Sequence, residues 1–281
     1  MNDADTIPAR LHAILAKDGK HGIVFRRGPS KRVCTFLWDR SRDSFQMGQW
    51  LKGRIYERRS DLSPDGRHMI YFAMNGKWDS ETRGSWTALS RAPWLKAIEL
   101  YAKGDCWDGG GLFLSNTTYW LNDRKFGNHQ ALLNSGSVTR DEEFQPAESC
   151  GSECTGVYYP RLVRDGWSRT ADEQVGKWHS QTIFEKPLAK HWVLRKIVHG
   201  QVGPPIGKSS YWDEHALVNR ESGLELAQPE WEWADWDNNA LVWATGGCLF
   251  RARIESHSKI GRAKILHDFN NYSFEPIKAP Y

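Results

Sequence analysis

The chain has 281 residues, of which 40% are hydrophobic and 26% are charged, and its formal net charge is only +4. A chain of this length can bury a substantial core, and its mild, scattered charge is unlike the clustered basic charge of nucleic-acid-binding domains. For that reason a nucleic acid is not the expected partner. No apolar run reaches the length of a membrane span, so a membrane is not expected either.

Tryptophan is unusually frequent, with 15 residues beside 9 tyrosines and 11 phenylalanines. Each buried indole removes a large area from water and needs a partner for its N–H group. This composition favours packed β-sheets, exposed aromatic platforms, or both.

The N-terminal residues contain no basic segment followed by an apolar one, so no signal peptide is expected. The five cysteines are spread along the chain. Reduced thiols in the cytoplasm are therefore the expectation, with no cofactor.

The first predicted element is a short helix over Pro8 to Lys17, because Leu11, Ile14 and Leu15 have helical spacing. We expect residues 1–20 to form an N-terminal helix or extension and residues 21–281 to form a single domain. Strand patterns follow at residues 23–25, 33–38 and 45–49.

The most informative segment is the turn Pro64-Asp65-Gly66, which precedes the apolar strand Met69–Ala73. Proline presets φ, aspartate can bond the backbone two residues on, and glycine accepts a positive φ. A counterpart lies at residues 234–244, where Asn238-Asn239 takes the place of the Asp-Gly pair. A partner strand is predicted after it, at Cys248 to Ile254.

Two weaker copies of this strand-turn-strand pattern lie at residues 106–121 and 160–167. Modules of roughly forty to fifty residues are typical of four-stranded propeller blades. The sequence therefore predicts an all-β, β-propeller-like chain of about five blades, in which Ala263–Phe269 supplies the last strand and closes the ring against the N-terminal blade.

Two regions depart from this pattern. Ser85 to Lys103 is predicted to contain a short helix or a bent edge strand, since Trp94, Ala97 and Ile98 have helical spacing. Asn122 to Ser152 is polar and is predicted to be one long loop, either functional or a simple insertion.

The segment Leu62-Ser63-Pro64-Asp65-Gly66-Arg67, followed by an apolar strand, resembles the repeat of TolB-like β-propellers and is similar to WD40-like blades. The resemblance covers one blade. It implies a fold and no particular activity, because propellers host unrelated functions.

A metal or redox site has one candidate, the pair Cys150 and Cys154. Their spacing is compatible with zinc, but a second pair is absent, and His129, His179 or His191 could complete a site only through the tertiary fold. Two free thiols in a loop are the simpler interpretation, and no metal is expected.

The candidate catalytic carboxylates are Asp65, Asp108 and Asp165, which occupy predicted turns, and those of the segment Trp231 to Asp237. Turn chemistry accounts for the first three. Strand alternation places Trp231 and Trp233 on one face and Glu232 on the other, which favours a core strand over a glycosidase pair.

Two further patterns carry no ligand signature. The run Gly109-Gly110-Gly111 lacks the lysine of a phosphate loop and predicts a tight turn or a close backbone approach. The densest basic groups, around Arg26-Arg27 and Arg54 to Arg59, are predicted to be solvated strand faces or loops.

Tryptophans in predicted loops are the remaining candidates for a binding surface. These are Trp78, Trp86, Trp94, Trp107, Trp178 and Trp212. The first hypothesis is a non-catalytic binding or scaffold protein that holds a protein partner or a small ligand on these rings. The alternative function is a carbohydrate-active hydrolase with carboxylates and tryptophans in a central pocket. The structural alternative is that the tryptophan rings only fill gaps between blades.

Overall fold

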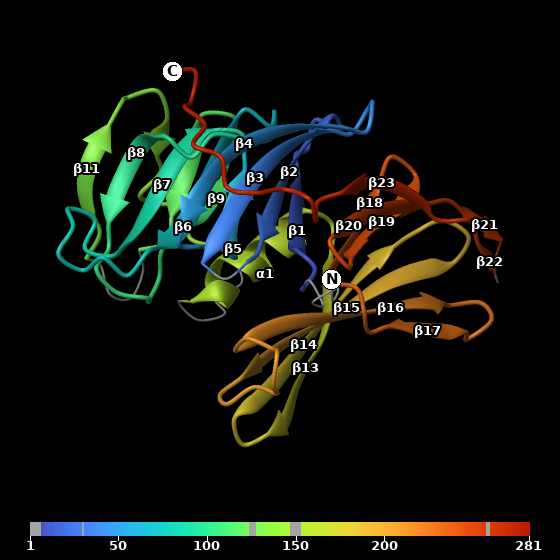
Figure 1. Cartoon of the computed structure of the whole chain (residues 1–281). Coiled ribbons are helices and arrows are strands. Elements are labelled where there is room, and N and C mark those ends of the chain that lie inside the picture. The colour runs from blue at the N-terminus through green and yellow to red at the C-terminus, as the bar shows by residue number, and fades with distance from the viewer. Residues whose placement is uncertain (1–6, 30, 124–127, 147–152, 257–258) are drawn as a thin grey trace, which may run out of the picture. The chain divides into compact units, whose positions relative to one another are not determined.

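The computed structural model describes residues 7–29, 31–123, 128–146, 153–256 and 259–281 (Figure 1). Within these ranges the regular elements are strands, apart from helix α1 (Cys154–Arg164). The chain divides into two compact units, which we describe separately. Unit 1 comprises the residues up to Arg161 together with Asn271–Tyr281, and unit 2 comprises Leu162–Asn270.

The first sheet of unit 1 is an antiparallel meander of four consecutive strands. They are β1 (Arg10–Leu15), β2 (His21–Arg27), β3 (Arg32–Asp39) and β4 (Ser44–Lys52). The predicted N-terminal helix is wrong, because β1 pairs with β2 along its whole length. Leu11, Ala13 and Ile14 are all buried, so both faces of this strand are covered and its apolar residues need not alternate.

The second sheet of unit 1 has the spatial order β11-β8-β7-β6-β5. Its strands are β5 (Arg54–Leu62), β6 (His68–Met74), β7 (Ser85–Arg91), β8 (Ala97–Ala102) and β11 (Gln130–Asn134). The predicted turn joins β5 to β6, and Gly66 has a φ of 72° as expected. Ser85 to Lys103 forms two interior strands, so neither a helix nor an edge strand is present there.

A third, smaller sheet combines β9 (Gly111–Phe113), β10 (Thr118–Leu121) and β12 (Thr139–Arg140). The prediction of one long loop from Asn122 to Ser152 is therefore wrong in part, because β11 and β12 both lie in that region. Both strands are short and mostly exposed, so neither shows the alternation of buried and exposed residues from which a strand is predicted.

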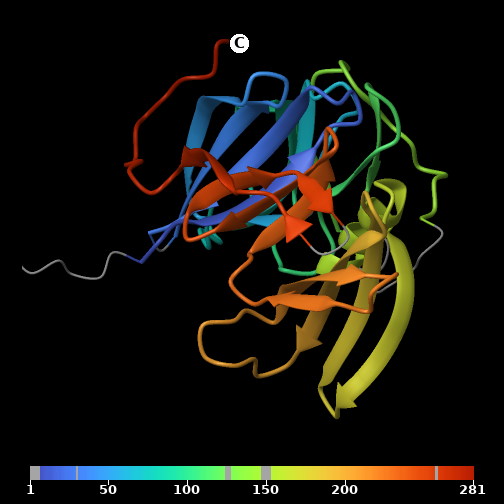
Figure 2. The ribbon, with the colours of Figure 1, turned by 90° about the vertical axis from the view of Figure 1, so that its right-hand side faces the viewer.

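Unit 2 contains a five-stranded meander that follows α1 (Figure 2). Its strands are β13 (Ser168–Gly176), β14 (His179–Pro187), β15 (Trp192–Gln201), β16 (Tyr211–Asn219) and β17 (Glu225–Gln228). The predicted blade copy at residues 160–167 is instead the C-terminal part of α1. Gly166, with a φ of 88°, ends the helix: its N–H donates to Val163 and that of Trp167 donates to Leu162, the Schellman pattern.

The last sheet of unit 2 contains β18 (Trp233–Asp237), β19 (Ala240–Thr245), β20 (Cys248–Ala252) and β23 (Lys264–Asp268), and a small hairpin joins β21 (Ile254–Ser256) to β22 (Lys259–Ile260). Asn238 and Asn239 both have positive φ in the β18–β19 hairpin, so this counterpart of the Asp65-Gly66 turn is confirmed. The expectation for Ala263–Phe269 is wrong, because β23 pairs with β20 in its own sheet and not with the N-terminal strands.

The fold class is thus confirmed as all-β and propeller-like. Five of the described sheets have three or more strands, and most are antiparallel meanders of consecutive strands, the construction of a propeller blade. In the part of the chain that the structure describes, no helix is both long and apolar enough to span a bilayer. The single domain at residues 21–281 stays a prediction.

Candidate functional site

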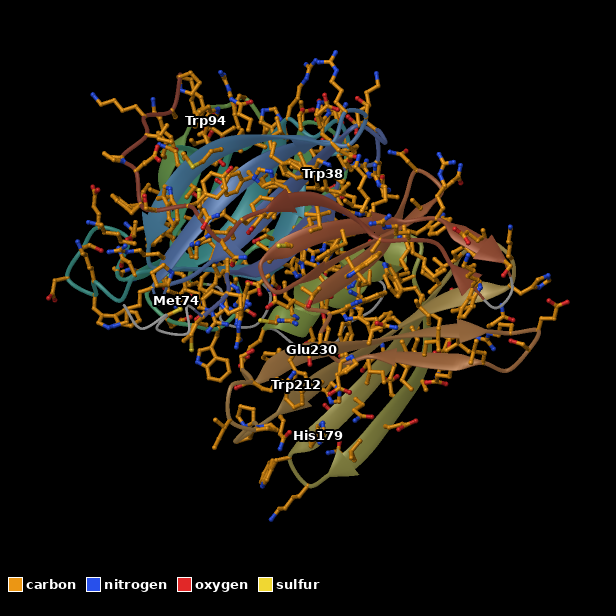
Figure 3. The ribbon with its side chains drawn as sticks, turned by 45° about the vertical axis from the view of Figure 1, so that its right-hand side comes forward. Trp38, Met74, Trp94, His179, Trp212 and Glu230 are labelled. Carbon is orange, nitrogen blue, oxygen red and sulfur yellow. The ribbon has the colours of Figure 1, made fainter. Side chains whose placement is uncertain are left out.

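One end of the second sheet carries two exposed tryptophans together with polar loop residues, and we call it the loop end. The register pairs Met74 with Ser85, Trp86 with Ala102, and Gln130 with Ala102. Residues 75–84, 103–110 and 128–129 therefore leave the sheet together. Figure 3 labels Met74 at this end and Trp94 at the opposite end.

Two of the predicted tryptophans are exposed at the loop end. Trp78 is 52% exposed in the β6–β7 loop, and Trp107 is 45% exposed in the loop after β8. A Cβ at Gly84 would meet the Trp78 ring, so this indole lies flat against a glycine, while the backbone N–H of Trp107 donates to Asp105 Oδ1 at 2.9 Å. Trp86 is half-buried at the start of β7, beside these loops.

The other three predicted tryptophans lie elsewhere. Trp94 is half-buried in the β7–β8 loop, and Trp178 is 64% exposed at the tip of the β13–β14 hairpin of unit 2. Trp212 is only 8% exposed and stacks on His199 with ring centroids 4.4 Å apart; Figure 3 shows it near His179. The loop assignment is wrong for Trp86 and Trp212, which lie in β7 and β16, because small polar neighbours concealed their strand alternation.

A buried polar network holds the loops in place. The Lys103 ammonium, fully buried, lies 3.2 Å from Asp105 Oδ2 and also donates to the side-chain oxygen of Asn128. Asn128 Nδ2 donates to Asp105 Oδ2 at 2.9 Å, and Ser85 Oγ donates to the Asp105 carbonyl at 2.7 Å. Burial opposes ionisation of Asp105, but the donors from Asn128, Trp107 and Lys103 outweigh it and lower its pKa.

Beside this network, a hydroxyl, an imidazole and a carboxylate form a relay. His129 Nδ1 lies 2.7 Å from Asp123 Oδ1, and His129 Nε2 lies 3.2 Å from Thr87 Oγ1. Thr87 Oγ1 also accepts the Gly110 N–H at 2.9 Å. Thr87 and the His129 side chain are fully buried, so no substrate can reach the hydroxyl. The relay therefore anchors loops, although its residue types are those of a nucleophilic triad.

The relay predicts a defined acid sensitivity. Burial raises the pKa of Asp123, but the hydrogen bond and charge of His129 and the charge of Arg140 lower it overall. A depressed folded-state pKa stabilises the protein above the unfolded value of about 3.9, and this stabilisation is lost as the pH falls through the folded pKa.

We therefore expect Asp123→Asn to cost about 2 kcal/mol of unfolding free energy near neutral pH. The variant should also lose less stability than the wild type below about pH 4. Urea titrations at several pH values measure both effects, and Asp79→Asn, at an exposed carboxylate in the β6–β7 loop, is the control. Parallel pH profiles for wild type and Asp123→Asn would contradict the assignment.

The glycine run has the role that the sequence predicted. Gly109 and Gly110 have φ values of 84° and 74°, and a Cβ at Gly110 would overlap the carbonyl oxygen of Arg59. Arg59 in turn donates through Nη1 to the carbonyl oxygens of Cys106, at 2.7 Å, and Asp108, at 2.6 Å. The prediction that the basic groups are solvated is therefore wrong for Arg59, and also for Arg26, because both side chains are buried. The roles of Asp105 and Asp123 were not predicted, because each acts through contacts between distant segments.

The three turn aspartates do not gather at one site. Asp65 accepts hydrogen bonds from Ser63 Oγ and the Arg67 N–H in the β5–β6 turn, which confirms turn chemistry. Asp108 is buried with a φ of 54° in the loop after β8, at the other end of the sheet. Asp165, in unit 2, pairs with Arg164 at 2.8 Å.

The core strand expected over Trp231 to Asp237 is confirmed from Trp233 on, as β18, whereas Trp231 and the half-buried Glu232 precede it. Trp231 stacks on Trp243 with centroids 5.0 Å apart. Its carboxylates form ion pairs, Asp235 with Lys186 at 2.5 Å and Asp237 with Arg251 at 2.6 Å. Such pairing leaves little scope for acid–base catalysis at these two groups.

The cysteine pair cannot be followed as a pair, because Cys150 lies outside the described residues. Cys154 is a free thiol, but it begins α1 and is buried, so its assignment to a loop is wrong. His179 Nε2 contacts His199 Nδ1 at 2.9 Å within unit 2. Among the described residues, no group of three His, Cys, Asp or Glu side chains is arranged to hold a metal ion.

Comparisons with known proteins add little to this picture. No family model matches the chain, and no curated protein matches it. Among solved structures, Kuenenia stuttgartiensis hydrazine synthase aligns over 90% of this chain and 79% of its own, with 8% identity and a TM-score of 0.28. The β-propeller domain of the Trilobed protease from Pyrococcus furiosus aligns over 94% of this chain and 100% of its own, also with 8% identity, at a TM-score of 0.29. The description of the chain as all-β and propeller-like therefore rests on its own sheets.

Proposed function

We propose that this chain is a non-catalytic binding protein whose ligand, a protein segment or a small molecule, packs on Trp78 and Trp107 at the loop end. The observation that carries the proposal is that two indoles, 52% and 45% exposed, emerge from neighbouring loops of one sheet end. Exposed tryptophans supply large apolar contact area at low conformational cost, and they dominate many binding surfaces.

The surroundings of these rings support recognition. Asp105, Asn128 and Lys103 form a network that fixes the loop backbone before any ligand arrives. Arg83 Nη2 donates to the Asn128 carbonyl at 3.3 Å and ties the two loops together. Loops that are ordered in advance lose less entropy on binding, which favours affinity.

The carbohydrate-active enzyme is the weaker candidate. A glycosidase needs two carboxyl groups about 5 to 10 Å apart that can exchange protons with a substrate. At the loop end, Asp105 accepts bonds from Asn128 and Lys103, and Asp123 is bonded to a buried imidazole. Both carboxyl groups are held in structural contacts, which disfavours them as the acid and base of a glycosidase.

The test is a titration of tryptophan variants against ligands selected on the wild type. Panels of soluble oligosaccharides and of peptides are screened by intrinsic fluorescence, and each ligand that binds is titrated by calorimetry. Trp78→Ala with Trp107→Ala is expected to weaken binding by at least about thirtyfold, since one such ring contributes about 2 kcal/mol or more.

Trp178→Ala is the matched control, because this ring is also exposed, at 64%, but lies in unit 2. It should leave the affinity within about twofold, as expected for a residue outside the contact. Binding that survives the double variant, or that is lost in the control, would refute the proposal. Release of reducing sugar from an oligosaccharide would favour the enzyme.

A further inference from the structure

Unit 2 carries a separate group of exposed apolar side chains, at the tips of two neighbouring hairpins. Trp178 is 64% exposed in the turn between β13 and β14. In the loop between β15 and β16, Val202 is 74% exposed and Ile206 is fully exposed. We call these three residues the tip cluster. Single exposed apolar side chains need no explanation, but a group of them at one place marks a surface that contacts another body.

The register of the sheet places the two tips side by side. His179 at the start of β14 stands opposite Gln201 at the end of β15, and Figure 3 labels His179 at this end of the sheet. The Val202 N–H donates to the Trp178 carbonyl oxygen at 3.0 Å, so the backbones of the two tips are directly bonded. The tip cluster is therefore one surface built from two loops.

The backbone of the longer loop holds Ile206 away from the sheet. The Lys208 N–H donates to the Pro205 carbonyl oxygen at 3.0 Å and closes a turn with Ile206 at its second position. Pro204 and Pro205 precede this residue and fix two φ angles of the loop. At the base of the loop, the Gln201 N–H donates to the Ser210 carbonyl oxygen at 2.9 Å. The apolar side chain is thus presented to the outside by a closed turn.

The charged residues of the two tips are all basic. Residues 177–178 and 202–210 include Lys177 and Lys208, both of which are exposed, and contain no aspartate or glutamate. Lys177 Nζ lies 5.4 Å from the centre of the Trp178 ring, so one ammonium group borders the exposed indole directly. The tip cluster is therefore flanked by positive charge.

The exposed acidic residues of the adjoining strands are set back from the tips. Glu173 of β13 stands opposite Gln181, and Glu214 Oε2 of β16 lies 3.5 Å from His199 Nε2. Each glutamate is three residues from the strand end, which is about 10 Å at the usual rise of a strand. Positive charge and apolar area thus coincide at the tips, and negative charge lies behind them.

We propose that this end of unit 2 binds the surface of an anionic lipid bilayer, with the tip cluster in the interfacial layer and Lys177 and Lys208 against the headgroups. Tryptophan and aliphatic side chains insert into the boundary between headgroups and acyl chains. Lysine extends its apolar stem along that layer and keeps its ammonium group at the lipid phosphates.

A bilayer fits these tips because it accepts protruding side chains from two loops without a matching cavity, and because its negative charge complements the two lysines. Binding at the bilayer surface needs no membrane-spanning segment, so it differs from the membrane contact that the sequence analysis considered. The site draws on unit 2 alone and does not depend on the tryptophan pair proposed as a binding surface in unit 1.

The experiment measures co-sedimentation of the full chain with two kinds of vesicle. One is pure phosphatidylcholine, and in the other about a third of the lipid is phosphatidylserine. We expect binding to the anionic vesicles to be about twentyfold stronger, which is the contribution of two lysines near the surface. Added sodium chloride should reduce this preference, because it screens the charges.

Apolar variants test the insertion of the tip cluster. Trp178→Ala and Ile206→Ser should each weaken binding to both kinds of vesicle by about tenfold, since each removes apolar area that the bilayer would take from water. Ile265→Ser, at a 57% exposed position of β23 in the same unit, is the matched control, and so is Trp78→Ala in unit 1. Both controls should bind like the wild type.

Charge variants test the contact with the headgroups. Lys177→Gln and Lys208→Gln should each weaken binding to the anionic vesicles by about fivefold and leave binding to the neutral vesicles unchanged. Melting curves followed by circular dichroism should be the same for wild type and every variant, because all the replaced side chains are exposed.

Three results would overturn the proposal. The first is that the wild type sediments with neither kind of vesicle. The second is that Trp178→Ala and Ile206→Ser bind vesicles as well as the wild type does, or that the controls lose as much binding. The third is a dimer of the wild type that Trp178→Ala and Ile206→Ser dissociate, without vesicle binding, which would identify the tips as a contact between copies of the chain.

Discussion

Replacing Gly110 with alanine should destabilise the protein by about 4 kcal/mol, the sum of backbone strain and overpacking. Gly110 has a φ of 74°, and an added Cβ would overlap the carbonyl oxygen of Arg59. Backbone cannot move aside as a flexible side chain can. Any displacement of the Gly110 backbone would also disturb the hydrogen bond from the Gly110 N–H to Thr87 Oγ1. Urea titration followed by far-ultraviolet circular dichroism measures the change.

Gly76→Ala is the matched control for that experiment. Gly76 has a similar φ of 71°, but a Cβ there would have no heavy atom within 4 Å. Its cost is expected to be about 1 kcal/mol, which is the conformational penalty alone. The difference between the two variants isolates the steric term. Equal costs would show that the approach of Arg59 to Gly110 does not constrain the fold.

Replacing Trp38 with alanine should cost about 4 kcal/mol, the usual effect of deleting a buried tryptophan. Trp38 lies in β3, is fully buried, and stacks on Phe45 with ring centroids 5.7 Å apart. Its Nε1–H donates to Asp43 Oδ1 at 3.3 Å. The substitution leaves a cavity and removes the donor from this carboxylate, and both effects lower the free energy of unfolding.

Trp107→Ala provides the comparison, because this ring is 45% exposed. It should change the free energy of unfolding by less than about 1 kcal/mol, as is usual for surface positions. The same urea titration serves for both variants. A large loss of stability in Trp107→Ala would mean that the ring is a structural plug, and it would remove the main support for the binding surface.

Much of the sheet structure was predictable because strand patterns and turns are local. The apolar run Met69–Ala73 and the turn Pro64-Asp65-Gly66 were both recognised correctly. Short polar strands such as β12 carry no recognisable pattern, and the few apolar residues of β1 fit the helical period as well as the strand period. The segment Ala263–Phe269 was expected to pair with the N-terminal blade but pairs with β20. The sequence of one strand does not specify its partner strand.

The candidate sites were less predictable. Three of the tryptophans expected in a binding surface are exposed, but only Trp78 and Trp107 of these share a sheet end. The basic groups around Arg26-Arg27 and Arg54 to Arg59 were expected to be solvated, but Arg26 and Arg59 are buried, since segments distant in sequence cover them. Lys103, buried at the centre of the loop network, also resembles an ordinary surface lysine in sequence.

The amino-acid sequence by itself determined the β class, the positions of several strands, and the turns that require glycine or asparagine. These features depend on side-chain alternation and on the φ angles of single residues, which are short-range properties. Only the tertiary structure decided which tryptophans face solvent, which carboxylates are held in ion pairs, and that Arg27, distant in sequence, pairs with Glu57. These outcomes depend on burial and on Coulomb interactions between segments, which exist only after the chain has folded.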